Sequence, residues 1–596
     1  MSEDASPEVP ARGWLGPARL GIGLAQGLAG FLLDRSWEAK AWPATSPMLF
    51  WALVLFVFFW PLILLSGLGG LRRRTLIAWS VVSGLLILAF GAYDIWRQAP
   101  LPLGSVFPSG QVILAIATAL FVGHHLVVAG EGARRWIGPY TAYYDAAWKD
   151  GVQLALAWLF VGVFWGLLWL GAELFKLIGI SAFETFIQKD WFAYPATGVM
   201  FAWAVQLTDA RANLTRGVRT IMLALLSWLM PLMAAIVAAF VIALPFTGLG
   251  PLWRTHAAGN VLLSAAAALI VLVNATYHDG TPERRPLLVL RWAGRLAAVL
   301  VAPLVLIAGY GILLRVHQYG WSPQRIVALA CGVVGASYAA GYVVAAVRPA
   351  PWLKPLERTN IITALVILAV IVALFSPAAD PARISVADQL ARLDAGKTPV
   401  DRFDFDFLRF QGVRFGKDAL GALKARKTGP NAALIAQRAT DEETGRLPSE
   451  PPTVQPATIV AHIEMYPKGK TLPKGFLNQR WESPNNQYLV GPCVALVQDC
   501  DGFLIDMDGD GVDEVLLADD SSLWVYKVGP DGRWTHFGTL NPMDEKLRGV
   551  LRAGKFAAVA SPWKDLQVGQ VRLRFSPHDA ATPEVIFNAR APASPR

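Results

Sequence analysis

The chain has 596 residues, of which 54% are hydrophobic and only 16% charged, and its formal net charge is +9. Soluble globular proteins carry about 25% charged residues, so this composition excludes an ordinary soluble protein. Residues 1–375 hold 26 basic and 16 acidic side chains, whereas residues 376–596 hold 27 and 28. Because the positive excess lies in short loops between apolar runs, it indicates a membrane protein and argues against nucleic-acid binding.

Residues 1–17 are polar and contain three prolines, so we expect a cytoplasmic tail there and not a cleaved signal peptide. Eleven apolar runs follow, and each is close to the roughly 20 residues that cross a bilayer. They cover 18–34, 47–68, 75–95, 110–129, 152–175, 192–208, 219–245, 257–276, 288–314, 325–346 and 359–375. The first is rich in glycine and the sixth is short, so these two are the weakest. The sequence therefore predicts an α-helical polytopic membrane bundle of about eleven spans over residues 18–375.

Basic residues between the runs predict the orientation, because cytoplasmic loops are enriched in Lys and Arg. With the N-terminus in the cytoplasm, the inner segments carry 18 basic residues and the short outer loops carry 8. An odd number of spans then places residues 376–596 outside the cytoplasm. We therefore expect a bacterial inner-membrane protein with a periplasmic C-terminal part.

Several separated stretches suggest a family. They are LPFTGLGPLW (244–253), NATYHDG (274–280), QYGWSPQR (318–325), RISVADQLARLDAG (383–396) and FDFLRF (405–410). In this order they resemble bacterial membrane proteins grouped as domain-of-unknown-function family 4153, over roughly residues 18–425. The resemblance implies a membrane location, but it implies no activity and no catalytic residues.

The sequence changes character after residue 375. Residues 376–426 are typical of short helices, and residues 427–456 are rich in Gly, Pro and acidic residues, which predicts a flexible linker. Residues 457–596 contain short β-like runs separated by turn residues, which predicts a small β-rich extracytoplasmic domain. The runs are TIVAHIEMY, YLVGPCVALV, EVLLAD, SLWVYKV and VRLRF.

The stretch DMDGDGVDE, residues 506–514, has the composition of a calcium loop. Calcium takes six to eight oxygen ligands, and alternating acidic side chains can converge on one ion as the chain curls. The expected ligands are the carboxylates of Asp506, Asp508, Asp510 and Glu514 and the carbonyl of Val512. The loop resembles the calcium hairpins of FG-GAP and integrin-type repeats and lacks the final glutamate of an EF-hand. The alternative is a solvated Asp-Gly turn that binds nothing.

Two cysteines precede this loop. Cys493 and Cys500 flank a short stretch that has the character of a hairpin, and they could form a disulfide in an oxidising periplasm. The alternative is a pair of buried thiols. An extracytoplasmic location would also expose the loop to calcium, because extracellular modules work with Kd values of about 10⁻⁴–10⁻³ M.

Within the apolar runs, His124 and His125 form a candidate intramembrane polar site, because ionisable residues in membrane spans are often functional. Adjacent helical residues point about 100° apart, so the two histidines are poorly placed to share one small metal ion. Gly162 and Gly166 form a small-xxx-small pair that predicts close helix packing. No phosphate-binding loop, nucleophile elbow or zinc-protease motif stands in a suitable place.

Three functions remain open. The first is a non-enzymatic membrane platform that presents a calcium-stabilised periplasmic interaction or sensing domain to an envelope protein or glycan. The second is a transporter or channel, which a continuous polar cavity would favour. The third is a membrane glycosyltransferase acting on lipid-linked sugar, which a groove at the outer surface lined by Asp34 or Glu38 would favour. A solid bundle would favour the platform, which the sequence alone ranks first, so an enzyme is the less expected outcome.

Overall fold

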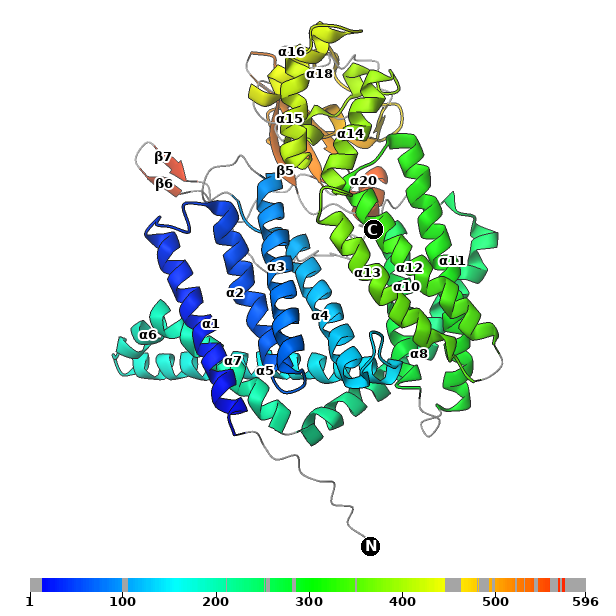
Figure 1. The fold of residues 1–596 in the computed structure, drawn as a ribbon. Coiled ribbons are helices and arrows are strands. Elements are labelled where there is room, and N and C mark those ends of the chain that lie inside the picture. The colour runs from blue at the N-terminus through cyan, green and yellow to red at the C-terminus, as the bar shows by residue number, and fades with distance from the viewer. Residues whose placement is uncertain are drawn as a thin grey trace, which may run out of the picture. The chain divides into compact units, whose positions relative to one another are not determined.

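The computed structural model describes residues 13–98, 106–210, 212–250, 252, 258–280, 286–348, 351–444, 462–479, 481, 492–495, 499–519, 522–529, 531–540, 545–557, 566–568 and 571–573. The chain divides into two compact units, Met1–Thr444 and Gly445–Arg596. The first unit is helical, and the second contains a small sheet (Figure 1). The prediction of a helical membrane bundle followed by a small β-containing domain is confirmed.

Eleven long helices occur in the described part of the first unit, one for each predicted run. They are α1 (Leu15–Glu38), α2 (Pro47–Gly67), α3 (Arg73–Gln98), α4 (Gly110–Ala133), α5 (Tyr140–Leu177), α7 (Asp190–Ala210), α8 (Ala212–Thr247), α10 (Ala258–Tyr277), α11 (Leu288–Tyr319), α12 (Pro323–Val347) and α13 (Pro355–Leu374). A short helix α6 (Ala182–Ile187) precedes α7. Among the described residues, nine helices are long and apolar enough to cross a membrane, and the two that fall short are α1 and α7.

Helices α1 and α7 pack against each other through glycines. A Cβ atom on Gly23 would overlap the backbone of Gly198, and one on Gly27 would overlap the backbone at Pro195. Such close approach of two backbones needs residues without a side chain, and it gains van der Waals contact over a long interface. The two least hydrophobic of the long helices are therefore partners. The glycine pair expected to pack, Gly162 and Gly166, has no neighbour within 4 Å, so that expectation is wrong for this structure.

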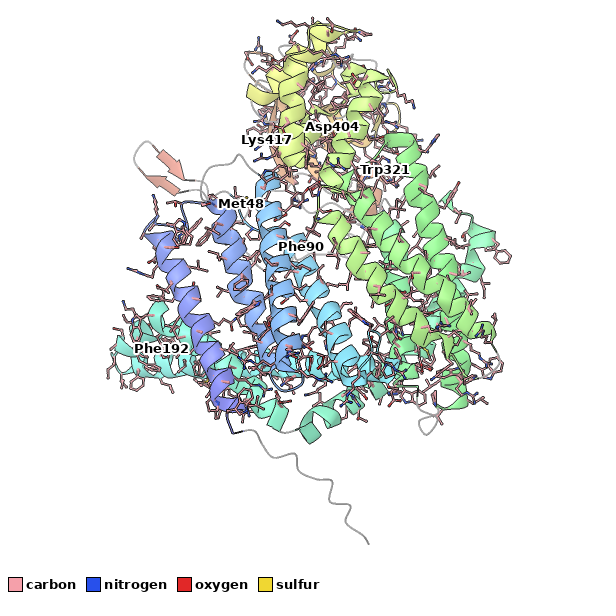
Figure 2. The ribbon with its side chains drawn as sticks, in the orientation of Figure 1. Met48, Phe90, Phe192, Trp321, Asp404 and Lys417 are labelled. Atoms are coloured by element: carbon pink, nitrogen blue, oxygen red, sulfur yellow. A yellow bond between two sulfur atoms is a disulfide. The ribbon has the colours of Figure 1, made fainter. Side chains whose placement is uncertain are left out.

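After α13 the first unit continues as a group of short helices that we call the helical cap. It consists of α14 (Pro381–Asp394), η2 (Val400–Arg402), η3 (Phe407–Gln411), α15 (Val413–Lys424) and α16 (Ala432–Thr444). Its core contains the buried side chains of Phe403, Phe405, Leu408 and Leu420. The cap is bonded to helix ends of the bundle, since Asp388 accepts from the backbone N–H of Trp321 at 2.8 Å. Figure 2 labels Trp321 at this end of the bundle and Asp404 and Lys417 in the cap.

Helix α16 lies inside residues 427–456, for which the sequence predicted a flexible linker, so this part of the prediction is wrong. Ile435 and Ala439 are buried in the core of the cap and lie on one face of the helix. These two buried positions are enough to dock so short a helix. The polar residues around them obscure the amphipathic pattern in the sequence.

The second unit contains a sheet of five strands in the order β1 (Ile463–Met465), β2 (Cys500–Ile505), β3 (Glu514–Ala518), β4 (Leu523–Val528) and β5 (Trp534–Leu540). Strand β1 is parallel to β2, and the other neighbours are antiparallel. Short helices α18 (Lys474–Asn478), α19 (Pro492–Ala495) and α20 (Glu545–Arg552) and the strand pair β6 (Leu566–Val568) and β7 (Val571–Leu573) complete the described part.

Successive residues of β3 lie in different cores, as the alternation of side chains along a strand requires. Val515 and Leu517 belong to one hydrophobic cluster, and Leu516 and Ala518 to another, so both faces of the sheet are covered. The run YLVGPCVALV was expected to form a strand, but its described part is helix α19. Pro492 favours this outcome, because proline is well tolerated in the first turn of a helix.

Candidate functional site

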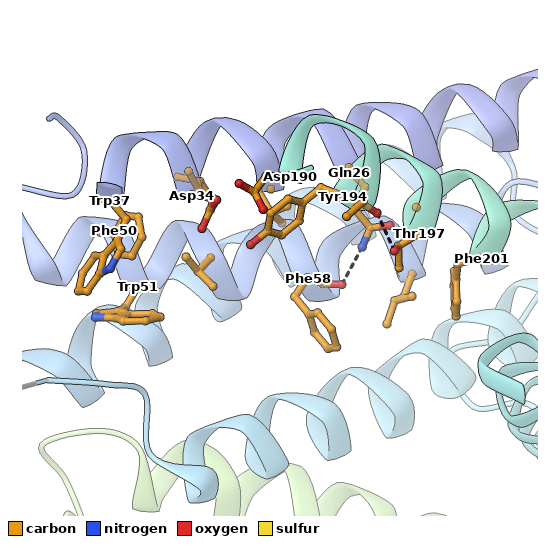
Figure 3. A pocket seen from close by; sticks show the side chains of 18 of the residues that line it. Gln26, Asp34, Trp37, Phe50, Trp51, Phe58, Asp190, Tyr194, Thr197 and Phe201 are labelled. Carbon is orange, nitrogen blue, oxygen red and sulfur yellow. Dashed lines mark hydrogen bonds between the residues drawn. The ribbon is translucent and has the colours of Figure 1, made fainter. Parts of the chain in front are cut away.

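A cavity of about 800 Å³ lies between α1, α2, α5 and α7. Its lining comes from α1 (Gln26, Gly27, Gly30, Leu33, Asp34, Trp37), α2 (Phe50, Trp51, Val54, Val57, Phe58, Leu62), α5 (Trp158) and α7 (Asp190, Ala193, Tyr194, Thr197, Gly198, Phe201), with Phe107 from the segment before α4. Figure 3 shows this lining from close by. The volume falls in the range of sites that bind small molecules, about 300–1,000 Å³.

Eight of the twenty lining residues are aromatic. Trp37 stacks on Phe50 with ring centroids 5.1 Å apart, and Trp51 lies 5.2 Å from Phe107. Farther along the cavity Phe58 lies 6.3 Å from Trp158. Rings of this size offer a large apolar contact surface with few rotatable bonds, so the wall suits hydrocarbon chains.

The charged residues of the lining are acidic. The carboxylates of Asp34 and Asp190 face the cavity from α1 and α7, and Figure 3 shows them beside Tyr194. Carboxylate oxygens of Asp34, Glu38 and Asp190 lie within 4.8 Å of one another. Glu38 pairs with Arg35 at 2.8 Å and is not among the lining residues. The two carboxylates that line the cavity are those of Asp34 and Asp190.

Two residues of this site were candidates from the sequence, and two were missed. Asp34 and Glu38 were expected in a first outer loop over residues 34–46, but α1 continues to Glu38, so both lie in its last turns. Asp190 and Tyr194 were not predicted, although the stretch DWFAYP combines acidic and aromatic residues at the start of α7. The contact of α1 with α7 through their glycines brings Asp34 and Glu38 close to Asp190 and Tyr194.

The two histidines of α4 belong to a second polar cluster. Both are buried, with exposed fractions of 3% and 6%, and their ring planes are nearly perpendicular. Ser66 of α2 lies between His124 and Asp150 of α5. Its Oγ is 3.0 Å from His124 Nε2 and donates to Asp150 Oδ2 at 2.8 Å. Trp79 of α3 donates to His124 Nδ1 at 3.2 Å.

Asp150 also lies beside the second histidine, since its Oδ2 is 3.4 Å from His125 Nε2. Sequence reasoning found the two histidines because they are ionisable and lie within an apolar run. It missed Ser66, Trp79 and Asp150, which come from three other helices and carry no local signal.

A family model described as "Domain of unknown function (DUF4153)" matches residues 41–425, which is more than half of the chain. The chain belongs to this family. No curated protein and no solved structure matches it. The match covers α2 to α15, and therefore includes the histidine cluster and the α7 side of the cavity.

The acidic loop of this DUF4153 protein lies in the second unit, outside the family match. It joins β2 to β3, whose residues Ile505 and Glu514 are paired. Asp506 accepts from the backbone N–H groups of Gly509 at 2.7 Å and Gly511 at 2.9 Å, and both glycines have positive φ. These bonds curl the loop, so that oxygens of Asp506, Asp508 and Glu514 come within 4.8 Å of one another.

A cation of the protein itself contacts this loop. The ammonium group of Lys527, from β4, is hydrogen-bonded to Asp508 and to Asp510, the latter at 2.8 Å, and lies 3.5 Å from Glu514. These bonds lower the pKa of Asp510 below its ordinary value and raise the pKa of Lys527. A calcium ion bound by these carboxylates would therefore compete with Lys527. The backbone N–H of Val512 donates to Asp510 at 2.8 Å. The carbonyl of Val512, which the sequence predicts as a calcium ligand, accepts no hydrogen bond from a described side chain of the loop.

Cys493 and Cys500 are joined by a disulfide, with their Cα atoms 5.9 Å apart. The bond links helix α19 to the start of β2, so the two cysteines do not flank a hairpin as the sequence suggested. Both side chains are buried in the core on one face of the sheet. The third cysteine, Cys331, lies in α12 and is free.

Proposed function

We propose that this DUF4153 protein binds a lipid-like amphiphile in the cavity between α1, α2, α5 and α7, with a positively charged headgroup against Asp34 and Asp190. The observation that carries the proposal is the pairing of an aromatic wall with two carboxylates in one cavity. Each methylene group moved from water into such a wall contributes about 0.8 kcal/mol, so a hydrocarbon chain supplies most of the affinity. The carboxylates then select the headgroup by charge.

The test uses the full-length protein in lipid nanodiscs and two fluorescent probes of equal chain length, one with a trimethylammonium headgroup and one with an uncharged headgroup. Asp190→Asn should weaken binding of the cationic probe about tenfold, the loss of one charge-assisted contact, and leave the uncharged probe nearly unchanged. Glu173→Asn is the control, because this glutamate of α5 is 62% exposed and does not line the cavity. Equal losses for both probes would refute the charge selection.

The same carboxylates support a second candidate, an enzyme that acts on lipid-linked sugar. Oxygens of Asp34, Glu38 and Asp190 are close enough to hold a divalent cation, which could contact the phosphate of such a substrate. With a divalent cation bound, the enzyme would transfer the sugar from its polyprenyl phosphate carrier to an acceptor hydroxyl, which gives up its proton, and would leave free polyprenyl phosphate. Asp34→Asn would abolish that transfer. Tight binding of the lipid-linked sugar without turnover, in the presence of magnesium or manganese, would refute the enzyme and support only the binding function.

For the second unit, we propose a calcium-stabilised interaction or sensing domain in the periplasm, with an envelope protein or glycan as partner. The curled loop with its converging carboxylates supports calcium, and the charge bias between loops supports the location. Hydrogen exchange of the full-length protein tests the metal. Peptides from β2 and β3 should be better protected in millimolar calcium than in chelator, because an ion that binds only the folded loop stabilises it.

Matched substitutions locate the ion. Asp508→Ala should remove most of the calcium effect, since Asp508 supplies oxygens to the converging group. Asp513→Ala should keep it, because Asp513 is not among the converging carboxylates. Identical exchange with and without calcium would mean that Lys527 alone neutralises the loop.

A further inference from the structure

We propose that His125 and Asp150 form a buried binding site for a single proton, which Ser66 and His124 extend to Trp79. The site lies among α2, α3, α4 and α5 and is separate from the cavity lining. It follows from which atoms in this cluster can donate a hydrogen bond and which can only accept one.

The tautomer of His124 is set by Trp79. An indole N–H can only donate, so His124 Nδ1, which lies 3.2 Å from Trp79 Nε1, must be the acceptor and carries no proton. The proton of a neutral His124 is therefore on Nε2, from which it is donated to Ser66 Oγ at 3.0 Å. The Ser66 hydroxyl in turn donates to Asp150 Oδ2 at 2.8 Å, which fixes the direction of this chain of bonds. His124 is thus held as a neutral imidazole.

His125 is set the opposite way. Its Nδ1 lies 2.6 Å from the backbone carbonyl of Phe121, and a carbonyl can only accept, so Nδ1 carries a proton. In a neutral His125 the other nitrogen, Nε2, would then present a lone pair to Asp150 Oδ2 only 3.4 Å away. Nε2 is buried and has no hydrogen-bond partner among the described residues.

Two lone pairs facing each other in a buried site repel, and one added proton converts the repulsion into an ion pair or a hydrogen bond. The bound proton lies on His125 Nε2, so the occupied site is an ion pair of imidazolium and carboxylate. Asp150 has an exposed fraction of 22% while His125 has 7%, so the proton exchanges with solvent on the side of Asp150.

Several charged groups on the surrounding helices are paired with one another in the described part of the chain. Lys149, next to Asp150 on α5, pairs with Asp209 of α7 at 2.9 Å, and Asp209 also pairs with Arg19 of α1 at 2.9 Å. Helix α13 also packs on α4 and α5, and its Glu357 pairs with Lys354 at 2.8 Å. Ser66 and Trp79, which α2 and α3 contribute to the cluster, are uncharged. A proton on His125 would therefore supply a positive charge beside Asp150.

The test is nitrogen NMR of the full-length protein in nanodiscs with labelled histidine. His124→Gln and His125→Gln identify the two signals among the 8 histidines. We expect His124 as the neutral tautomer with its proton on Nε2, and His125 with a proton on Nδ1 and a second, exchangeable proton on Nε2. Opposite tautomers would overturn the proposal.

The substitution Asp150→Asn tests the pairing directly. In this variant His125 should carry one proton, on Nδ1, under the conditions in which the unaltered protein shows two, because an amide no longer favours the imidazolium. Asp145→Asn is the control, since Asp145 lies on the same helix, is 53% exposed and pairs with Arg219. A second proton still present on His125 in Asp150→Asn would overturn the proposal. If that variant does not fold, the tautomers of the unaltered protein decide.

Discussion

Asp380 shows how a single residue joins the membrane bundle to the helical cap. One of its oxygens caps α14, accepting from the N–H groups of Ala382 at 2.8 Å and Arg383 at 3.0 Å. The other accepts from Tyr93 at 3.0 Å and lies 3.4 Å from Arg97 Nη1. Asp380 is fully buried, so both sets of bonds are made away from water, where lost partners are costly.

We predict that Asp380→Ala destabilises the first unit by about 3–5 kcal/mol, because it removes a buried acceptor from Tyr93 and from two backbone N–H groups of α14. Arg97 also loses this contact but keeps its pair with Asp94. Asp380→Asn should cost less, because asparagine still caps a helix. Asp394→Ala, at the other end of α14, should cost less than about 1 kcal/mol, since Asp394 is 59% exposed and pairs with Arg426. Denaturant unfolding of the full-length protein in detergent measures all three. A loss for Asp394→Ala as large as that for Asp380→Ala would contradict this account.

Lys527 provides a prediction for the acidic loop. Removing it as Lys527→Ala leaves Asp508 and Asp510 without their cation, so the sheet of the second unit should exchange faster in chelator and recover in millimolar calcium. The pKa of Asp510 is lowered from 3.8, so its bond with Lys527 stabilises the fold above that pH and is lost as pH falls through the lower folded value. The difference between the two proteins should therefore shrink in strong acid. Lys468→Ala serves as the control, since Lys468 is 79% exposed and pairs with Glu464 and not with the acidic loop.

The sequence identified the acidic side chains of both candidate sites only in part. Asp506, Asp508 and Glu514 are close in sequence, so their convergence could be predicted from spacing alone. Asp34 and Asp190 are far apart in sequence and meet only because α1 packs on α7. The sequence did not predict Ser66, Trp79 and Asp150, the partners of the histidines, for the same reason, because they lie on three other helices. Spacing predicts local sites, whereas sites built from several helices depend on packing that one sequence does not display.

At the level of elements, hydrophobic runs predicted every long helix of the bundle, because a membrane span must satisfy its backbone internally and is apolar along its length. The same reasoning was weaker in the second unit. Strands β2, CDGFLI, and β5, WTHFGTL, contain polar residues and glycine, and neither was among the predicted runs. Their places in the sheet depend on pairing with neighbours and not on their own composition.

The contact of α1 with α7 supports a third prediction. Gly23→Ala should force the helices apart, because its Cβ atom would overlap the Gly198 backbone, at a cost of about 1–3 kcal/mol. Gly21→Ala is a matched control on the same helix with nothing within 4 Å, and alanine should be neutral or favourable there. Hydrogen exchange of α1 measures the effect. Since both helices line the cavity, Gly23→Ala should also weaken binding of the amphiphilic probe, and equal binding in the two variants would contradict the role of this contact.

At the scale of the whole molecule, the number of membrane spans determines which loops lie on each side of the membrane. If α1 and α7 cross along with the other nine helices, 18 basic residues lie inside and 8 outside. If neither crosses, Arg72–Arg74, Arg134, Arg135 and Lys149 move outside, and Arg35, Lys40, Arg97, Lys176 and Lys189 move inside. The split becomes 17 to 9, so charge hardly separates the two arrangements.

The structure distinguishes the nine-span from the eleven-span arrangement through the contacts between α3 and the segment after α13. Asp380 follows α13 and contacts Tyr93 and Arg97 near the end of α3, so these two helix ends lie on the same side. With eleven spans both ends are outside. With nine, the end of α3 would be inside while that of α13 stayed outside. The contact therefore favours eleven spans, with α1 and α7 crossing as a packed pair.

If the N-terminus is cytoplasmic, as proposed, both arrangements place the C-terminal unit outside, because nine and eleven are both odd. A reporter after Arg596 therefore does not distinguish them. A reporter within residues 68–71, between α2 and α3, does. We predict that alkaline phosphatase is inactive there and active after Arg596, and that green fluorescent protein behaves the opposite way. Phosphatase activity at both positions would support nine spans and remove α1 and α7 from the membrane. Inactivity after Arg596 would reverse the proposed orientation and, with it, the access of the acidic loop to periplasmic calcium.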